Sequence, residues 1–177
     1  MVENLNVTTY QNGDPIPQVQ DKTKWMQLKT GAWCYYENKT ENGKIYGKLY
    51  NWFAITDPRG LAPKDWHIPT ELEWTNLVME VTSDEKNSYL SGERLKSVNG
   101  WKQNGNGTDR NGFSAQPAGF HCGSYGPFLQ LGEKGHWWCI DDKVFVIEYN
   151  SKTAGFSGFR SKADGFSIRC IKDLKTD

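Results

Sequence analysis

The side chains that could carry out chemistry are few and widely separated. Three histidines, His67, His121 and His136, lie far apart in the sequence, and each stands beside an aromatic residue. Catalytic and metal sites require several such groups to converge, so we interpret these three as structural. The acidic pair Asp141–Asp142 and Glu148 could ligate calcium, but solvated charges are the simpler interpretation.

Four cysteines are equally scattered: Cys34, Cys122, Cys139 and Cys170. No C-x-x-C pair occurs, which argues against a zinc or thioredoxin-type site. The low cysteine density favours buried, reduced thiols over disulfides. If a bridge forms, Cys34 with Cys170 is the first choice, because both lie in strand-like, apolar or aromatic contexts. No Ser-His-Asp order, nucleophile elbow or phosphate loop is visible, so we expect no catalytic set, no cofactor and no metal.

The last quarter of the chain indicates recognition rather than catalysis. Two well-marked segments, residues 135–138 and 165–170, enclose a stretch with little pattern. Within it, residues 153–161 fit neither an amphipathic helix nor an alternating strand. Irregular segments that carry aromatic residues on a rigid frame commonly form binding surfaces.

Two aromatic residues in this stretch, Phe156 and Phe159, have Gly, Ser and Ala as neighbours and show no core periodicity. If exposed, they would form a binding hot spot with Tyr149 and Arg160, because interfaces favour aromatic residues and arginine. The alternative is that both rings plug the sheet. The predicted ligand-binding residues are Cys139, Ile140, Asp141, Phe145, Tyr149, Ala154, Phe156, Gly158, Phe159, Arg160, Ser161 and Asp164.

Three helices are predicted to position these residues. The clearest begins with a capping box at Thr70 and Glu73, after which apolar residues follow at helical spacing as far as Val81. A short helix is expected within residues 43–55, and another over residues 89–97. The Gly- and Asn-rich residues 99–112 are predicted to form a long surface loop, and if the chain held a structural ion, Asp109 in this loop would be the place to look for it.

The remaining pattern predicts short strands. Helices in the first half and a β-meander in the second imply an α+β domain with antiparallel sheets. The expected strands cover residues 4–10, 113–116, 119–120, 128–131, 135–138, 143–149 and 166–171.

Composition limits the class of protein. The 177 residues suit one domain, residues 1–177, large enough to bury a core. Lys plus Arg and Asp plus Glu number 21 each, so no net field would attract nucleic acid or an anionic membrane. No apolar run has the length of a membrane span, and the start lacks a signal segment. We expect neither a nucleic-acid partner nor direct membrane insertion; the protein is cytosolic or viral, or its leader has been removed.

Several short motifs follow one another along nearly the whole chain: residues 3–10 (ENLNVTTY), 47–52 (GKLYNW), 66–70 (WHIPT) with 73–74 (EW), 111–115 (NGFSA), 137–138 (WW) and 165–170 (GFSIRC). This pattern resembles the Fibrobacter succinogenes major paralogous domain. The resemblance implies a C-type-lectin-like fold, related to the domain of formylglycine-generating enzymes, with two main helices and paired N- and C-terminal strands. Family members are mostly exported or surface proteins of gut and rumen bacteria without an established activity.

One departure follows Trp138, where the family commonly continues Ser-Ser-Thr and this chain has Cys139-Ile140-Asp141. Changes there and through residues 154–164 resemble proteins that retroelements diversify by mutating template adenines. Such mutation of an Asn codon that ends in a pyrimidine cannot produce Lys, Glu, Gln, Met or Trp, and residues 153–161 contain none of these. With average residue frequencies, a stretch of this length would lack all five residues by chance about one time in seven or eight. The alternative that this is an ordinary surface domain, not diversified by a retroelement, therefore remains open.

These observations lead to one expectation and two alternatives. We expect a non-catalytic ligand-binding and adhesion module that presents residues 139–164 to a protein or glycan ligand on a cell surface. It would be exported or surface-exposed, or belong to a phage-associated particle. The calcium tripeptides of sugar-binding C-type lectins are absent. One alternative is an oxidase-like enzyme related to formylglycine-generating enzymes, using Cys122 and Cys139; the other is a structural surface or appendage subunit.

Overall fold

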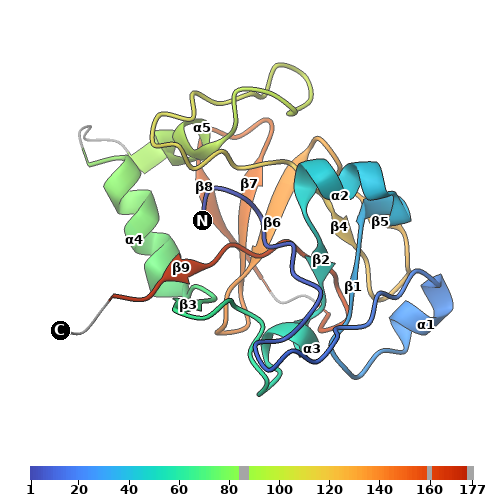
Figure 1. The fold of residues 1–177 in the computed structure, drawn as a ribbon. Coiled ribbons are helices and arrows are strands. Elements are labelled where there is room, and N and C mark those ends of the chain that lie inside the picture. The colour runs from blue at the N-terminus through green and yellow to red at the C-terminus, as the bar shows by residue number, and fades with distance from the viewer. Residues whose placement is uncertain (84–87, 159–160, 175–177) are drawn as a thin grey trace.

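The computed structural model describes residues 1–83, 88–158 and 161–174, which form a mixed α+β fold (Figure 1). The two longest helices are α2 (Thr40–Tyr46) and α4 (Glu71–Val81). Shorter helical segments are α1 (Lys22–Met26), α3 (Trp52–Ile55), α5 (Ser91–Leu95) and two 3-10 turns, Tyr36–Asn38 and Ser88–Leu90. The strands are β1 (Trp33–Cys34), β2 (Leu49–Tyr50), β3 (Trp66–His67), β4 (Phe120–His121), β5 (Phe128–Leu129), β6 (Lys134–Trp138), β7 (Val144–Glu148), β8 (Ala154–Ser157) and β9 (Ile171–Lys172).

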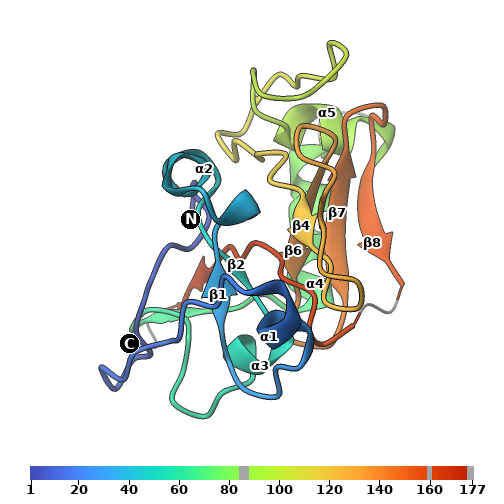
Figure 2. The ribbon, with the colours of Figure 1, turned by 90° about the vertical axis from the view of Figure 1, so that its right-hand side faces the viewer.

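The largest sheet among the described residues is the antiparallel meander β6-β7-β8 (Figure 2). Three antiparallel pairs accompany it: β1-β2, β3-β9 and β4-β5. One face of the meander packs on α4, where Trp74 stacks on Phe145 with ring centroids 4.2 Å apart. The opposite face buries Trp138 and Val144 against the main core cluster. The sequence prediction of strands at 135–138 and 143–149 is therefore confirmed.

Helix α4 begins as the sequence predicts. Thr70 Oγ1 accepts a hydrogen bond from the Glu73 backbone N–H at 3.2 Å, and Glu73 Oε2 accepts one from the Thr70 N–H at 2.8 Å. This reciprocal pairing satisfies two donors that the first helical turn leaves unpaired. The apolar stripe then buries Trp74 and Val81 against the meander.

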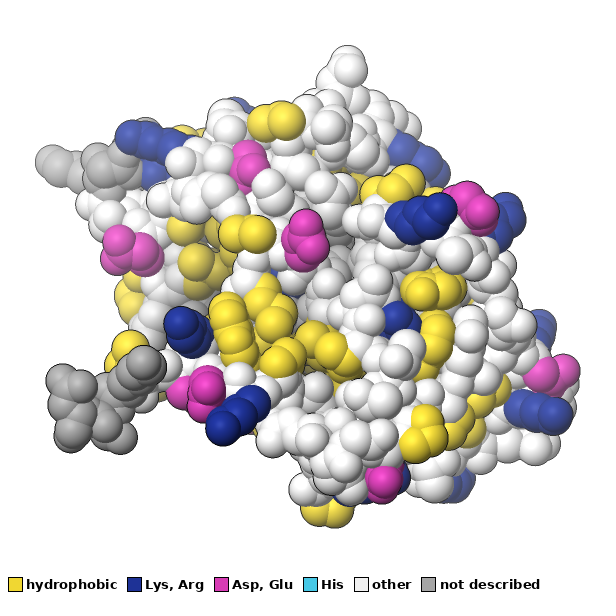
Figure 3. Space-filling model, viewed as in Figure 1, with side chains coloured by type: hydrophobic (Ala, Val, Ile, Leu, Met, Phe, Trp, Pro, Cys, Tyr) yellow, Lys and Arg dark blue, Asp and Glu magenta, His cyan; other side chains and the backbone are white. Residues whose placement is uncertain are grey.

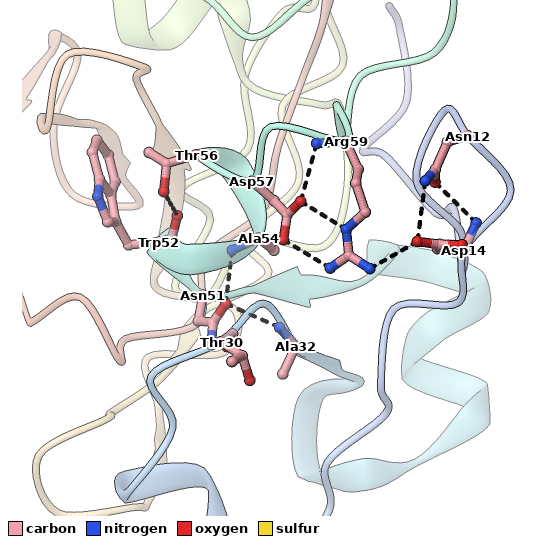
Figure 4. A network of polar contacts seen from close by, with 10 residues as sticks. All are labelled: Asn12, Asp14, Thr30, Ala32, Asn51, Trp52, Ala54, Thr56, Asp57 and Arg59. Carbon is pink, nitrogen blue, oxygen red and sulfur yellow. Dashed lines mark hydrogen bonds and ion pairs between the residues drawn. The ribbon is translucent and has the colours of Figure 1, made fainter.

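The prediction of a helix within residues 43–55 is wrong in its extent. Helix α2 ends at Gly47, whose φ of 73° suits glycine and whose Cα lies against Asn4 and Leu5. The next residues extend as β2 to pair with β1. Asn51 then caps α3: its Oδ1 accepts from the N–H groups of Ala54 and Ala32, both at 3.1 Å (Figure 4). The apolar spacing in this stretch comes from three separate elements, of which β2 and α3 are buried, and not from one helical face.

Two of the predicted strands are also wrong. Residues 4–10 form no strand, and β3, rather than an N-terminal strand, pairs with the C-terminal β9. Leu5 explains the difference: its N–H bonds to Ile168 O at 2.8 Å while its C=O accepts from Lys48, so its two backbone groups go to different segments. Residues 113–116 make only a single bridge, between Ala115 and Lys96.

The predicted strand 166–171 is a strand only at its end, in β9, yet residues 165–170 are buried along their whole length. Phe166 exchanges two backbone hydrogen bonds with β2, of 2.8 and 3.0 Å, and Gly165 exchanges two with β4. Ser167 bonds to β6 on the other side. The partners of this segment therefore come from four parts of the chain: Tyr50 in β2, His121 in β4, His136 and Trp138 in β6, and Leu5 near the N-terminus.

Arg169 is the buried charge of this segment, with 2% of its surface exposed. Its Nε donates to Asn4 Oδ1 at 3.0 Å, and its terminal nitrogens donate to the carbonyl oxygens of Phe113 and Ser114. Burial lowers the pKa of the guanidinium to about 10. Asn4 Oδ1 also accepts from Trp137 Nε1 at 2.9 Å. Side chains thus join the N-terminal segment to the C-terminal one, in place of a strand ladder.

Arg59 makes a second network on the surface (Figure 4). Its guanidinium contacts both carboxylate oxygens of Asp57 and reaches Asp14 Oδ2 at 3.1 Å. It also lies over the Tyr10 ring, 4.1 Å from the centroid. These contacts hold the turn near residues 12–14 against the loop that follows α3.

The packing around strand β6 of the meander can be tested at Gly135, which lies in that strand. A Cβ there would lie 2.2 Å from the Trp137 ring and 2.8 Å from Gln116 O. We expect Gly135→Ala to lower the free energy of unfolding by about 1–3 kcal/mol, because the indole or the backbone must move. Gly155→Ala in β8 is the matched control, since a Cβ there meets nothing within 4 Å. Urea unfolding measures both; equal losses would contradict the packing described.

Candidate functional site

Residues 139–164 contain the β7–β8 hairpin, the turn that leads into it and the segment that follows it. β8 pairs with β7 on one side and lies at the edge of the meander (Figure 2). The predicted ligand-binding residues fall into classes by exposure. Buried are Cys139, Phe145 and Asp164; half-buried are Tyr149, Ala154 and Ser161; exposed are Ile140, Asp141, Phe156 and Gly158; Phe159 and Arg160 lie outside the described residues.

The three buried members support the surface and do not reach it. Phe145 stacks on Trp74. Burial raises the pKa of the Cys139 thiol to about 12, so it is protonated and unreactive near neutral pH. Asp164 Oδ1 accepts from Gly123 N–H at 2.7 Å and its Oδ2 from the Ser161 N–H at 3.2 Å, which fixes the chain before residue 165.

The exposed members at the start of the segment lie beside the first turn of α4. Ile140, 38% exposed, donates its backbone N–H to Pro69 O at 2.9 Å. Asp141 Oδ2 accepts from the Glu71 N–H at 2.8 Å, where a carboxylate also suits the helix dipole. An ion pair between Lys143 and Glu71 closes the contact. The backbone of this turn is therefore fixed by contacts to α4, and the Ile140 side chain is its exposed apolar group.

Phe156 projects from the edge strand. Its ring meets Phe145 edge-on, with centroids 5.5 Å apart, and 38% of the residue is exposed. The ring therefore covers the sheet in part and is accessible in part. Neighbouring Gly155 and Gly158 leave open space where a side chain would begin. The edge near Phe156 is the apolar centre of the exposed part of the segment.

A buried lysine binds the backbone of the turn between β7 and β8. Lys96, 3% exposed, follows α5, and its Nζ donates to the carbonyl oxygens of Ser151 at 2.9 Å, Tyr149 at 3.2 Å and Glu148 at 3.3 Å. Burial lowers the pKa of this ammonium. Because all three of its N–H groups point at turn carbonyls, Lys96 fixes the turn's conformation.

Beside this turn lies a polar pocket of about 300 Å³. Sequence reasoning missed it, because its second wall is the surface loop within residues 99–112. The pocket is lined by Glu93, Lys96, Gln103, Asn104, Gly105, Asn106, Tyr149, Asn150, Ser151 and Lys152. The amide-rich loop composition was the available signal, but nothing in the sequence places that loop against the β7–β8 turn.

A larger apolar hollow of about 850 Å³ lies on another face, between the N-terminal segment, α4 and residues 111–113. Met1, Trp66, Leu77 and Phe113 line it, and Figure 3 shows hydrophobic side chains gathered there. It lies outside residues 139–164. Sequence reasoning treated Trp66 and Phe113 as motif residues and did not predict a hollow.

The titratable side chains described next, which lie outside residues 139–164, make structural contacts. His67 lies between Glu73 Oε1 at 2.7 Å and Asp173 Oδ1 at 2.6 Å, and the Asp173 contact raises its pKa. His121 is buried; burial lowers its pKa to about 4, and its Nδ1 lies 3.5 Å from Cys34 Sγ. Among the residues that the structure describes, no group of three His, Cys, Asp or Glu side chains could hold a metal.

All four cysteines are free thiols. Cys122 packs against the main core cluster and Cys139 belongs to the cluster around Trp74, so the two do not share one site. Cys34 and Cys170 are buried in separate clusters as well. Within the described part of the chain, no helix has the length and apolar character needed to cross a bilayer.

The model of the Fibrobacter succinogenes major domain matches residues 1–172. The chain belongs to this family. Comparison with curated proteins and with solved structures gives no match.

We call the buried core and the segments bonded to residues 165–170 the frame of the domain. The motifs of this Fibrobacter succinogenes major domain lie in the frame and not on the exposed part of residues 139–164. Asn4, Asn51 and Trp137 each satisfy backbone or side-chain partners far away in the sequence. The segment 165–170 is buried throughout. The exposed hairpin edge and turns therefore contain residues that the frame does not require.

Lys96 tests how the domain holds its β7–β8 turn. We expect Lys96→Met to lower the free energy of unfolding by about 3 kcal/mol, because three turn carbonyls lose a charged donor. Lys102→Met is the control: this lysine is exposed, and its ion pair with Glu133 lies at the surface, so its loss should stay below about 1 kcal/mol. Urea unfolding gives both values. If Lys96→Met were as stable as the control, Lys96 would not hold the turn.

Proposed function

We propose that this Fibrobacter succinogenes major domain is a non-catalytic ligand-binding and adhesion module with a C-type-lectin-like fold. Its binding face is the exposed part of residues 139–164: the turn at Ile140 and Asp141, the edge around Phe156 and the β7–β8 turn. The ligand is a protein or glycan on a cell surface, and the domain acts outside the cell that makes it.

The observation that carries this proposal is the contrast between the face and its supports. Phe156 and Ile140 expose apolar surface on an edge strand and a tight turn. Phe145, which the Phe156 ring contacts, and Cys139, which precedes Ile140 in the chain, are buried. A partly exposed aromatic ring on a rigid support suits a binding hot spot, because little conformational freedom is lost on binding.

The same contrast supports sequence diversification of the face by a retroelement. Side chains added at Gly155 or Gly158 would start in open space, so substitutions there meet no steric barrier. Phe156 and Ser157 lie on the edge strand beside them. A face that accepts many side chains without disturbing its frame is what repeated mutation of this segment would require.

The buried, high-pKa Cys139 and its separation from Cys122 give the oxidase-like alternative no support. A low-pKa, accessible thiol is what such chemistry needs. A purely structural subunit would self-associate through its own surface. Sedimentation of the purified domain separates that alternative from adhesion.

Capture of cells tests the proposed face. We expect Phe156→Ser and Ile140→Ser each to reduce retention of the labelled domain on a panel of intact gut bacterial cells by about tenfold, since a hot-spot residue contributes about 1.4 kcal/mol or more. Tyr125→Ser, which alters an exposed aromatic residue elsewhere, is the control. Thermal unfolding confirms that each variant folds. Undiminished retention of both face variants would refute the assignment.

A further inference from the structure

The polar pocket beside the β7–β8 turn has three walls that come from distant parts of the chain. Glu93 and Lys96 come from α5 and the residue after it, Gln103 to Asn106 from the surface loop, and Tyr149 to Lys152 from the turn. Its volume of about 300 Å³ lies at the small end of the range for small-molecule sites. The pocket has room for the end of a ligand and not for a folded segment.

Backbone contacts fix the walls relative to one another. The loop approaches the turn so closely at Gly105 that a Cβ there would lie 2.4 Å from Tyr149 O. At Gly107 it approaches α5 equally closely, and the Gly107 N–H donates to Ser97 O at 2.9 Å. The Glu93 N–H donates to Lys152 O at 3.1 Å, which joins α5 to the turn. The pocket is therefore formed before any ligand arrives.

The lining is rich in groups that both donate and accept hydrogen bonds. Gln103, Asn104 and Asn150 are exposed, and each amide offers an NH2 group and a carbonyl oxygen. Tyr149 also lines the pocket, while its half-buried side chain packs against the core cluster around Trp74. Gln103 and Asn104 adopt φ values of 50° and 59°, a conformation that asparagine tolerates well. A ligand that matches this lining must itself present several adjacent hydroxyl or amide groups.

The charges of the pocket favour a polar rather than a strongly ionic ligand. The Lys96 ammonium lies beneath the pocket with its protons directed at three turn carbonyls. Lys152 Nζ and Glu93 Oε2 form an ion pair of 3.2 Å at the rim. Because Lys96 is buried and its protons are already bound by backbone carbonyls, no free charged donor among the described lining residues faces the pocket, which suits neutral hydroxyl groups.

We propose that this pocket binds the terminal sugar of a saccharide. Hydroxyl groups on adjacent ring carbons both donate and accept hydrogen bonds, as the amides of Gln103, Asn104 and Asn150 do. The inference rests on the proposed function and narrows it, because the β7–β8 turn belongs to the proposed binding face. It assigns a glycan ligand to that end of the face and requires no calcium.

Sugar titrations followed by NMR test the pocket. The probes are the methyl glycosides of glucose, galactose, mannose and N-acetylglucosamine, with glucuronic acid and N-acetylneuraminic acid as acidic arms, each up to about 20 mM so that millimolar affinities are detected. We expect at least one probe to shift the backbone amide signals of residues 102–106 and 149–152. A response to neutral sugars would assign the site to hydroxyl groups. A response restricted to the acidic sugars would show that the charge of Lys96 or Lys152 reaches a bound sugar carboxylate.

Two variants and one control make the assignment specific. Asn104→Gly keeps the left-handed backbone while removing the amide, and Asn150→Ala removes the amide of the turn. Each should weaken sugar binding about fivefold, the loss expected for one hydrogen bond of about 1 kcal/mol. Asn99→Ala, at an exposed asparagine that does not line the pocket, should leave binding unchanged.

Two outcomes overturn the inference: no probe shifts any amide, or shifts occur only outside the pocket. Cell capture distinguishes this failure from failure of the proposed function. If sugars do not bind but Phe156→Ser still abolishes cell retention, the face binds a protein and only the saccharide site is refuted. If cell retention does not depend on Phe156 while sugars bind the pocket, the proposed face is wrong and the pocket stands.

Discussion

The fold depends on one constraint: the peptide groups of residues 165–170 lie out of reach of water and must be hydrogen-bonded inside the protein. No single sheet supplies the partners. The backbone partners come from four different parts of the chain: Tyr50 in β2, His121 in β4, His136 and Trp138 in β6, and Leu5 near the N-terminus. Because the segment joins these parts, displacing any of them would leave buried polar groups unpaired, at a cost of about 1–3 kcal/mol each.

This constraint explains how the domain separates frame from face. Arg169 draws the N-terminal segment onto the core through Asn4, and Trp74 fixes α4 against β7. The β7–β8 hairpin is attached to this frame by its buried side, while its edge and both turns remain at the surface. Exposed side chains can therefore change at the surface without altering the buried contacts. The buried thiol of Cys139 belongs to the support of this surface.

Local signals in the sequence predicted those elements whose stability is local. The capping box at Thr70 and the apolar stripe that follows specify α4, and short apolar or aromatic runs mark β6 (KGHWW) and β7 (VFVIE). The motif at 165–170 identified the central segment, although its hydrogen bonds are not those of a continuous strand. The predictions of a strand at residues 4–10 and of one helix within residues 43–55 are wrong. The apolar residues there contact several different partners, and the resulting spacing mimics strand or helix periodicity.

The candidate site could be predicted only in part for the same reason. The sequence marked Phe156 as a residue without core periodicity, but the prediction that residues 153–161 form no strand is wrong, because residues 154–157 form β8. It also left open whether the Phe156 ring is exposed or plugs the sheet; the residue is 38% exposed. It did not separate buried Phe145 and Asp164 from exposed neighbours, because their burial depends on Trp74 and Gly123, which are distant in sequence. Nor could it place the amide-rich loop beside the turn, since the contact at Gly105 and the role of Lys96 depend on tertiary structure.

The most direct test of a fixed frame with a permissive face is a scan of all substitutions at residues 139–170, scored by protease resistance of the displayed domain. The account predicts that Ile140, Asn150, Phe156 and Gly158 accept most side chains without loss of the folded state. Residues 165–170 should accept almost none. Equal tolerance in the two groups, or a face as intolerant as the central segment, would contradict the separation of binding surface from frame.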